Sequence, residues 1–151
     1  MSGLAGDAFV AIWHDVLPEG KPDYYEWHNR EHMPERLGIP GFRRGRRYVT
    51  ERGAPEYFNL YEVDTMEVLT GQDYLNHLNN PTPLTRRMIV HLHNHLRSLC
   101  RVAVSFGRAQ GGLMMTWVSS LRRARRRSSS TTCDGTPSRA SSSEPAYWAR
   151  I

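Results

Sequence analysis

The chain has few cysteines and no long apolar segment. Only Cys100 and Cys133 occur among its 151 residues, which is too few, in surroundings too different, for the disulfide framework of a small secreted domain. No stretch approaches the roughly 18 apolar residues that a membrane span needs. Residues 1–7 also lack the basic segment and apolar run of a signal peptide. We therefore expect a cytoplasmic protein that does not bind membranes.

Residues 1–118 carry no net charge, although the whole chain is basic at +5. They contain 13 Lys and Arg against 13 Asp and Glu, whereas residues 119–151 contain seven Arg against two acidic residues. The basicity therefore belongs to the C-terminal segment. A glycine-rich phosphate-binding loop is also missing, so we expect neither a nucleotide, a metal nor any other cofactor.

The C-terminal segment is rich in Arg and Ser and has almost no aliphatic residues. Such a composition cannot bury enough apolar surface to offset the entropy lost on ordering, which predicts disorder. We expect a flexible N-terminus at 1–7, one domain at 8–112 and a disordered tail at 113–151. Two interpretations of this tail stay open: a genuine arginine-serine tail, or an out-of-frame translation of a GC-rich gene.

A nucleic-acid interface is the function that the basic tail would suggest. It would rest on a run of arginines that neutralise phosphates: Arg122, Arg123, Arg125, Arg126 and Arg127. No aromatic residues interleave with this run, so base stacking finds no support. We expect no nucleic-acid partner.

The order of the predicted elements indicates an α+β fold. Alternation with period two predicts strands at 8–16, 42–49, 56–63 and 100–106, and helical spacing predicts helices at 22–32, 66–78 and 84–96. The order β-α-β-β-α-β is that of a ferredoxin-like domain, with one four-stranded antiparallel sheet and helices on one face only. Since an uncovered sheet face commonly pairs with a second copy, we expect a homodimer.

The first predicted helix concentrates aromatic and titratable side chains on one face. At 100° per residue this face holds Tyr24, Tyr25, Trp27, His28, Glu31 and His32. Pro34 is predicted to disturb the helix and Gly38 to close its final turn. Such a face predicts the wall of a ligand pocket.

A helix that ends in a His-x-Pro element, followed by a Leu-x-Pro-Gly type turn into a strand, resembles the EthD-like members of the dimeric α+β barrel superfamily. The matching positions are His32, Pro34, Leu37 or Ile39, and Pro40-Gly41. The resemblance implies a ferredoxin-like domain that pairs through its sheet, with a lumen for a small apolar or aromatic compound. The superfamily includes cofactor-free cyclases, monooxygenases and haem-degrading enzymes, so no single reaction is implied.

His32 is the predicted catalytic residue, as general base or hydrogen-bond donor to an enolic or phenolic ligand, because imidazole titrates near neutral pH. His28, one turn earlier, would assist it. The predicted substrate-binding residues are Trp13, Tyr24, Trp27, Arg47, Tyr48, Tyr57 and Tyr61. Alternatives stay open: His32 could only order the end of its helix, and Arg47 could either hold an acidic ligand group or guard an edge strand, as we expect of Arg43 and Arg44.

The stretch from His28 to His32 also reads His-x-x-Glu-His, the inverted zinc-peptidase motif. Those enzymes need a third ligand and a larger catalytic domain, so we expect no zinc. A ligand cluster is equally unexpected for histidines that would spread around the axis of the last predicted helix or have no identifiable partner: His91, His93, His95, His14 and His77.

The sequence thus predicts a protein that binds a small aromatic or polyketide-like compound in a barrel lumen, with or without cofactor-free conversion of it. The alternative is a noncatalytic dimeric ligand-binding or stress-related protein.

Overall fold

A computed structural model describes residues 3–107, 111–119 and 147–150 of the chain. Its elements, with η marking 3-10 and π-helical turns, are β1 (Ala8–Val16), η1 (Pro18–Gly20), α1 (Lys21–Trp27), η2 (His28–His32), α2 (Met33–Leu37), β2 (Phe42–Arg52), β3 (Tyr57–Val63), η3 (Met66–Leu69), α3 (Gln72–Asn79), α4 (Pro83–Ile89), β4 (Leu92–Arg101), β5 (Leu113–Thr116) and β6 (Tyr147–Arg150).

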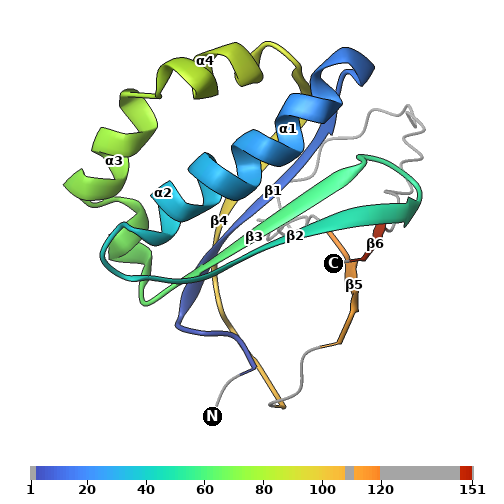
Figure 1. Cartoon of the computed structure of the whole chain (residues 1–151). Coiled ribbons are helices and arrows are strands. Elements are labelled where there is room, and N and C mark those ends of the chain that lie inside the picture. Colours follow the sequence, from blue (N-terminus) through green and yellow to red (C-terminus); the bar gives the residue numbers. More distant parts are fainter. Residues whose placement is uncertain (1–2, 108–110, 120–146, 151) are drawn as a thin grey trace, which may run out of the picture.

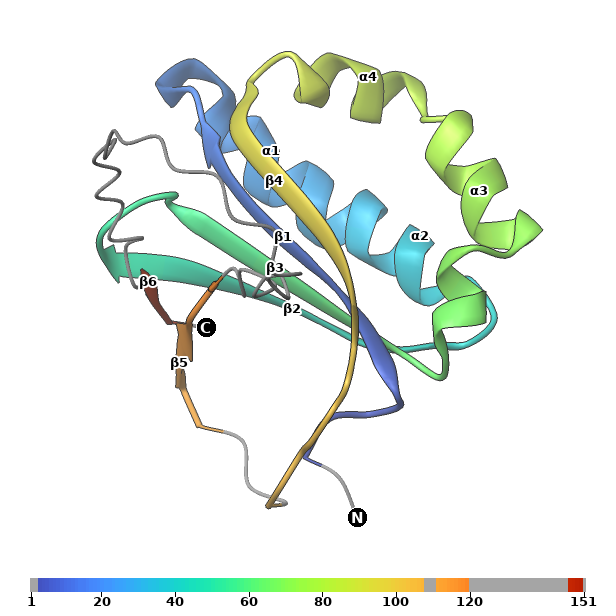
Figure 2. The ribbon, with the colours of Figure 1, turned by 180° about the vertical axis from the view of Figure 1, so that it is seen from behind.

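The strands β4, β1, β3 and β2 lie side by side in that order, and every neighbouring pair is antiparallel. Figures 1 and 2 show the helices gathered on one face of this sheet. The predicted α+β class with a four-stranded antiparallel sheet is therefore confirmed. Two short strands, β6 and β5, continue the sheet from the edge of β2. Both come from the segment predicted to be a disordered tail; its residues 120–146, including the arginine run, lie outside the described residues.

The pairing of β1 with β3 sets which side chains share a face of the sheet. Ala8 lies opposite Val63, and the register holds up to His14 opposite Tyr57. Because successive side chains of a strand point to opposite faces, the even-numbered residues of β1 face the helices and its odd-numbered residues face away. This confirms the alternation predicted for both strands.

The core consists of three clusters of buried side chains. One, which includes Val10 and Tyr61, fills one end of the space between helices and sheet. Another, which includes Val16 and Tyr57, fills the other end. Between them, the helix-facing positions of β1 and β3 hold Ile12, His14 and Asn59, which all line a cavity. The third cluster lies on the opposite face of the sheet: Ala11, Trp13, Tyr48, Phe58 and Leu60.

The first helix is longer than predicted, because it runs on past Pro34 to Leu37 as α1, η2 and α2. Proline has no N–H to donate within a helix, and its ring crowds the carbonyl four residues earlier. The preceding turn widens instead: the N–H of Met33 bonds the carbonyl of His28, five residues back. The helix then ends as predicted, where the Gly38 N–H bonds the Pro34 carbonyl at 2.9 Å.

The last helix and the fourth strand are present in the predicted order, but their predicted bounds, 84–96 and 100–106, are wrong. The helix α4 ends at Ile89, and Leu92 already begins β4. The leucines and methionine that predicted the helix recur every four residues, but Leu92 and Leu96 belong to β4. A shift in register between them places Leu92 opposite Val16 on the helix side and Leu96 opposite Trp13 on the other face. The interruption predicted at residues 80–83 is confirmed, since α3 ends at Asn79 and α4 begins at Pro83.

Gly41 makes the turn from the first helix into β2. Its φ of +90° favours glycine, and a Cβ there would lie 2.5 Å from Cγ2 of Val68. Gly41 is therefore needed both for the turn and for the close packing of η3 against it.

Candidate functional site

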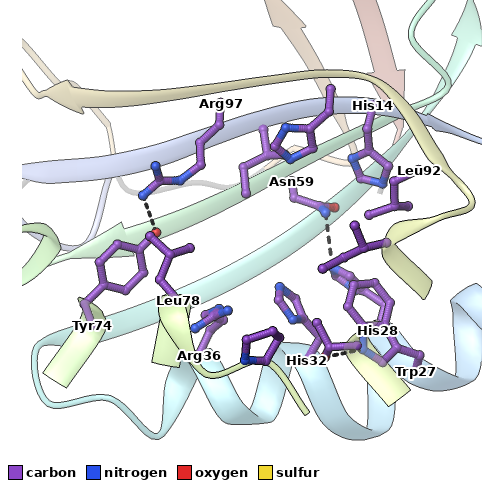
Figure 3. A pocket seen from close by; sticks show the side chains of 15 residues that line it. His14, Trp27, His28, His32, Arg36, Asn59, Tyr74, Leu78, Leu92 and Arg97 are labelled. Atoms are coloured by element: carbon purple, nitrogen blue, oxygen red, sulfur yellow. Dashed lines mark hydrogen bonds between the residues drawn. The ribbon is translucent and has the colours of Figure 1, made fainter. Parts of the chain in front are cut away.

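A cavity of about 430 Å³ lies between the helices and the sheet. This volume falls within the range of about 300–1,000 Å³ for small-molecule sites. Its walls come from β1, β3 and β4 on the sheet side and from the helical segments on the other (Figure 3). Leu78 and Ile89 line it and are exposed to solvent, so solvent reaches it between α3 and α4. The lining side chains are Ile12, His14, Trp27, His28, His32, Arg36, Asn59, Tyr74, Leu78, Pro81, Thr85, Ile89, Leu92, His95 and Arg97.

The π-helical turn η2 places His28 and His32 at its two ends. Their ring centroids are 5.8 Å apart, and the ring of His32 lies 4.5 Å from that of Trp27. All three side chains line the cavity, so the structure brings together both predicted catalytic residues and one predicted wall residue. The widened turn that Pro34 imposes is thus part of the cavity wall.

His28 is fully enclosed in a hydrogen-bond network. Nη1 of Arg47 lies 3.0 Å from its Nδ1, and since a guanidinium can only donate, Nδ1 accepts. The neutral ring then carries its proton on Nε2, which donates to the Tyr61 hydroxyl at 3.2 Å. Nδ2 of Asn59 lies 3.1 Å away and is itself a donor, so only the amide oxygen of Asn59 could accept from this N–H. Burial, then the charges of His32 and Arg47, lower the pKa of His28 to about 2. His28 is therefore a neutral residue that positions its neighbours, with neither nitrogen free for proton transfer.

His32 has more freedom than His28. Its Nδ1 is buried and has no hydrogen-bond partner, and the Glu35 carboxylate, 4.0 Å away, is too distant for a hydrogen bond. Burial, then the charge of Arg36, lower the pKa of His32 to about 3. Because His32 lines the cavity, its neutral imidazole suits a hydrogen bond to a ligand there. With a pKa this low, His32 would be a weak general base.

Glu31, the third member of the His-x-x-Glu-His stretch, fastens α4 to the first helix. Its Oε1 accepts from the hydroxyl of Thr82 and, at 3.4 Å, from that of Thr85. Thr85 also accepts from the indole N–H of Trp27 at 2.9 Å. Since its carboxylate is engaged in this way and Arg47 faces His28, the stretch does not assemble a cation site. No group of three or more His, Cys, Asp or Glu within the described ranges could hold a metal ion.

The sheet contributes imidazoles that the sequence did not single out as site residues. His14 Nε2 lies 2.9 Å from the Tyr24 hydroxyl, and burial first, with the nearby charge of His95 second, lowers the pKa of His14 to about 4. His95 lines the same cavity, and burial, then the charge of Arg97, lower its pKa. The alternation of histidines at 91, 93 and 95 could have indicated a strand that presents His95 to the helices.

Two arginines, one on a helix and one on the sheet, approach the ring of Tyr74. Cζ of Arg36, on α2, lies 5.9 Å from the ring centroid, and Cζ of Arg97, on β4, lies 5.5 Å from it. Arg97 also donates to the Tyr74 hydroxyl at 2.6 Å. Sequence analysis missed all three residues. Arg36 follows His28 and His32 at the same spacing of four, which could have revealed it, whereas the wrongly predicted helix hid Arg97.

The other predicted binding residues divide between two locations. Tyr24, Tyr57 and Tyr61 are buried behind the cavity wall, and burial raises the pKa of each hydroxyl. Trp13 and Tyr48 belong to the cluster on the opposite face of the sheet. No single pocket can therefore combine the first helix with that face, as the predicted lumen site required.

The arginines of β2 have separate roles. Arg43 is paired with Asp64 at 2.5 Å near the surface. Arg44 and Arg46 both bond the carboxylate of Glu62, which is buried on the face away from the helices. Arg43 and Arg44 therefore do more than guard an edge. Arg47 points to the helix side, where it bonds His28 and Asn29 and lies over the ring of Tyr25 at 4.8 Å, so its predicted contact with a ligand acid is already replaced by protein partners.

Two further observations concern the rest of the described chain. Cys100 is a free cysteine. None of the helices in the described ranges is long and apolar enough to cross a membrane.

Comparisons with known proteins leave the site to be interpreted by its own chemistry. No protein-family model matches the chain, no curated protein sequence matches it significantly, and no solved structure does.

Proposed function

We propose that the protein binds a small aromatic or polyketide-like compound in the cavity between its helices and its sheet. The observation that supports this proposal is the lining of the cavity, where Trp27 and Tyr74 contribute aromatic rings and His32 contributes a neutral imidazole. Ligand sites commonly combine apolar walls with a few placed polar groups. Burying the faces of an aromatic ligand would stabilise the complex by about 25 cal/mol per Å² of apolar surface removed from water.

The strand order β4-β1-β3-β2 supports the ferredoxin-like assignment, because it arises when two β-α-β units interleave. Together with the His32, Pro34 and Pro40-Gly41 pattern, it supports the proposal that the chain is an EthD-like protein of the dimeric α+β barrel type. In this proposal the ligand lies under the helices, and the face that carries Trp13 and Tyr48 pairs with a second copy.

His32 is proposed to anchor the ligand through a hydrogen bond, and His28 to hold the wall in place. A ligand with an enolic or phenolic hydroxyl would satisfy the imidazole of His32. Whether conversion follows binding separates two functions: a cofactor-free enzyme, or a noncatalytic binding protein. A His32→Gln variant that keeps its affinity but loses turnover would favour the enzyme, and the absence of turnover with every ligand that binds would favour the binding protein.

Binding is tested with a panel of neutral and acidic one- and two-ring aromatic compounds in thermal unfolding of the full chain. We expect some of them to raise the unfolding temperature of the wild type but not of Leu78→Trp, which places a large ring at the mouth of the cavity. The matched control is Val90→Trp, because Val90 is 71% exposed and does not line the cavity. If Leu78→Trp responds like the wild type, ligands bind elsewhere and the proposal is wrong.

A further inference from the structure

The charge of the cavity wall is not balanced. None of its lining residues is an aspartate or glutamate, while Arg36 and Arg97 both contribute guanidinium groups. Within the described part of the chain, neither arginine forms a salt bridge. The arginines of β2 between 43 and 47 bond a carboxylate or, in the case of Arg47, the side chains of His28 and Asn29.

Arg36 is the more unusual of the two. Its residue is only 8% exposed, and its Nη1 is buried without a hydrogen-bond partner; Nε of Arg97 is likewise buried and unpartnered. An arginine side chain cannot avoid the free-energy cost of burying its charge by losing its proton, because it stays protonated in proteins. A buried charge without a counter-charge is strongly unfavourable. Arg36 and Arg97 therefore lack a negatively charged partner.

The ring of Tyr74 explains the orientation of the two guanidiniums but does not balance their charge. Both groups lie within 6 Å of its centroid, where the face of an aromatic ring attracts cations. Such contacts contribute about 0.5–2 kcal/mol and leave the net charge unchanged. The two groups approach the same side chain from α2 and from β4 (Figure 3).

The nearby imidazoles are consistent with a positive field in the cavity. The charge of Arg36 contributes to the lowered pKa of His32, and the charge of Arg97 contributes to that of His95, each after burial. A negative ligand would oppose this effect, whereas a neutral ligand would not.

We infer that the natural ligand of this cavity is an aromatic carboxylate, with its carboxyl group held between Arg36 and Arg97 beside Tyr74. The aromatic part then lies toward Trp27 and Leu92, and the unused nitrogen of His32 remains available for a second polar group of the ligand. Guanidinium groups suit this task because their planar array of N–H donors matches a carboxylate. This inference rests on the proposed binding function and narrows it to an acid.

The test compares 2-naphthoate with 2-naphthamide, which have nearly the same shape but differ in charge, by titration calorimetry on the full chain near neutral pH. We expect naphthoate to bind more tightly. Arg36→Gln and Arg97→Gln should each weaken naphthoate about ten- to hundredfold, the loss of a charged hydrogen bond, and should leave naphthamide nearly unaffected. Arg43→Gln is the matched control, because Arg43 is an exposed arginine paired with Asp64 outside the cavity.

The outcomes separate the two proposals. Equal affinity of the two compounds for the wild type would overturn the carboxylate inference and leave the binding function standing, and this comparison does not depend on whether any variant folds. Equal loss of both compounds in Arg36→Gln would also overturn it, since the arginine would then only support the wall. Binding of neither compound, nor of any other aromatic compound in the panel, would overturn both proposals.

Discussion

Three histidines in the layer between helices and sheet are buried in their neutral form. Burial is the main cause that lowers the pKa of His14 to about 4, of His28 to about 2 and of His32 to about 3, from the ordinary 6.5. Below pH 6.5 the unfolded chain therefore binds more protons than the folded one. The free energy of unfolding falls as the pH is lowered, by about 1.4 kcal/mol per pH unit for each histidine.

Removing one of these histidines should flatten the dependence of stability on pH. The charged or titratable groups around His32 are Arg36, His28, His14 and, at 4.0 Å, Glu35. For His32→Gln, we expect the loss of stability between about pH 6.5 and 5 to be about 2 kcal/mol smaller than in the wild type. Urea unfolding at several pH values measures this.

The matched control for the pH prediction is His77→Gln. His77 is half-buried on α3, does not line the cavity and bonds the backbone carbonyl of Asp73 at 2.8 Å. Its pH dependence should follow the wild type. If His32→Gln gives the same slope as both, the imidazole of His32 is not held neutral in the fold.

Glu62 holds together the polar cluster on the opposite face of the sheet. Burial alone would raise the pKa of its carboxyl group, but bonds from Arg44, the Ala5 N–H and Arg46 outweigh this and keep the pKa below its ordinary value. Glu62→Gln would leave two partly buried arginines without their counter-charge, and we expect a loss of about 3–5 kcal/mol in the free energy of unfolding. The control is Asp64→Asn, which breaks only the exposed pair with Arg43. Chemical denaturation should show a much smaller loss of unfolding free energy for Asp64→Asn than for Glu62→Gln. Equal losses in the two variants would contradict the role assigned to Glu62.

At the scale of elements, two features were predicted most accurately from the sequence. These were the strands with strict alternation and the residues at which helices end. The residues of β1 and β3 have apolar or aromatic side chains on both faces, as expected of a strand that is covered on both sides. The two strands pair with each other in an antiparallel register. The boundary between α4 and β4 could not be predicted, because the leucines at 92 and 96 continue the helical spacing, while the register shift in β4 hides the alternation that would reveal a strand. That error removed His95 and Arg97 from the predicted site, whereas His28, His32 and Trp27 were found because one helix carries them all.

Thr82 shows how one residue joins two helical elements. It occupies the N-cap of α4, where its hydroxyl accepts the Thr85 N–H at 3.0 Å, and it also donates to Glu31 on η2. For Thr82→Ala we expect a loss of about 1–2 kcal/mol in the free energy of unfolding and weaker ligand binding, because α4 forms one side of the cavity mouth.

Thr65→Ala is the matched control for this capping prediction. Thr65 stands at the N-cap of η3 but its side chain makes no capping bond. Chemical denaturation should show a smaller loss for this variant. Equal losses for the two threonines would mean that the bonds of Thr82 do not fasten α4 to the first helix.

At the scale of the whole molecule, the sheet separates two chemically different sides. The helix side holds the cavity with its imidazoles and unpaired guanidiniums, and the other side holds Trp13 and Tyr48 with their apolar neighbours. The second side is covered only in part: Met114 of β5 packs against this cluster, and Thr116 accepts from the indole N–H of Trp13 at 3.3 Å. Leu96, which lies opposite Trp13 in β4, remains 51% exposed.

This partly covered face is where the proposed homodimer would form, so a charge placed on it should prevent pairing. Sedimentation of the full chain should show a dimer for the wild type and a monomer for Leu96→Glu, because a carboxylate buried against a second apolar face would have no partner. Val90→Glu is the control, since Val90 follows α4 on the helix side and is exposed, and this variant should remain dimeric. A wild type that sediments as a monomer at all concentrations would contradict the dimer, yet it would leave the cavity intact, because every residue that lines the cavity comes from one chain.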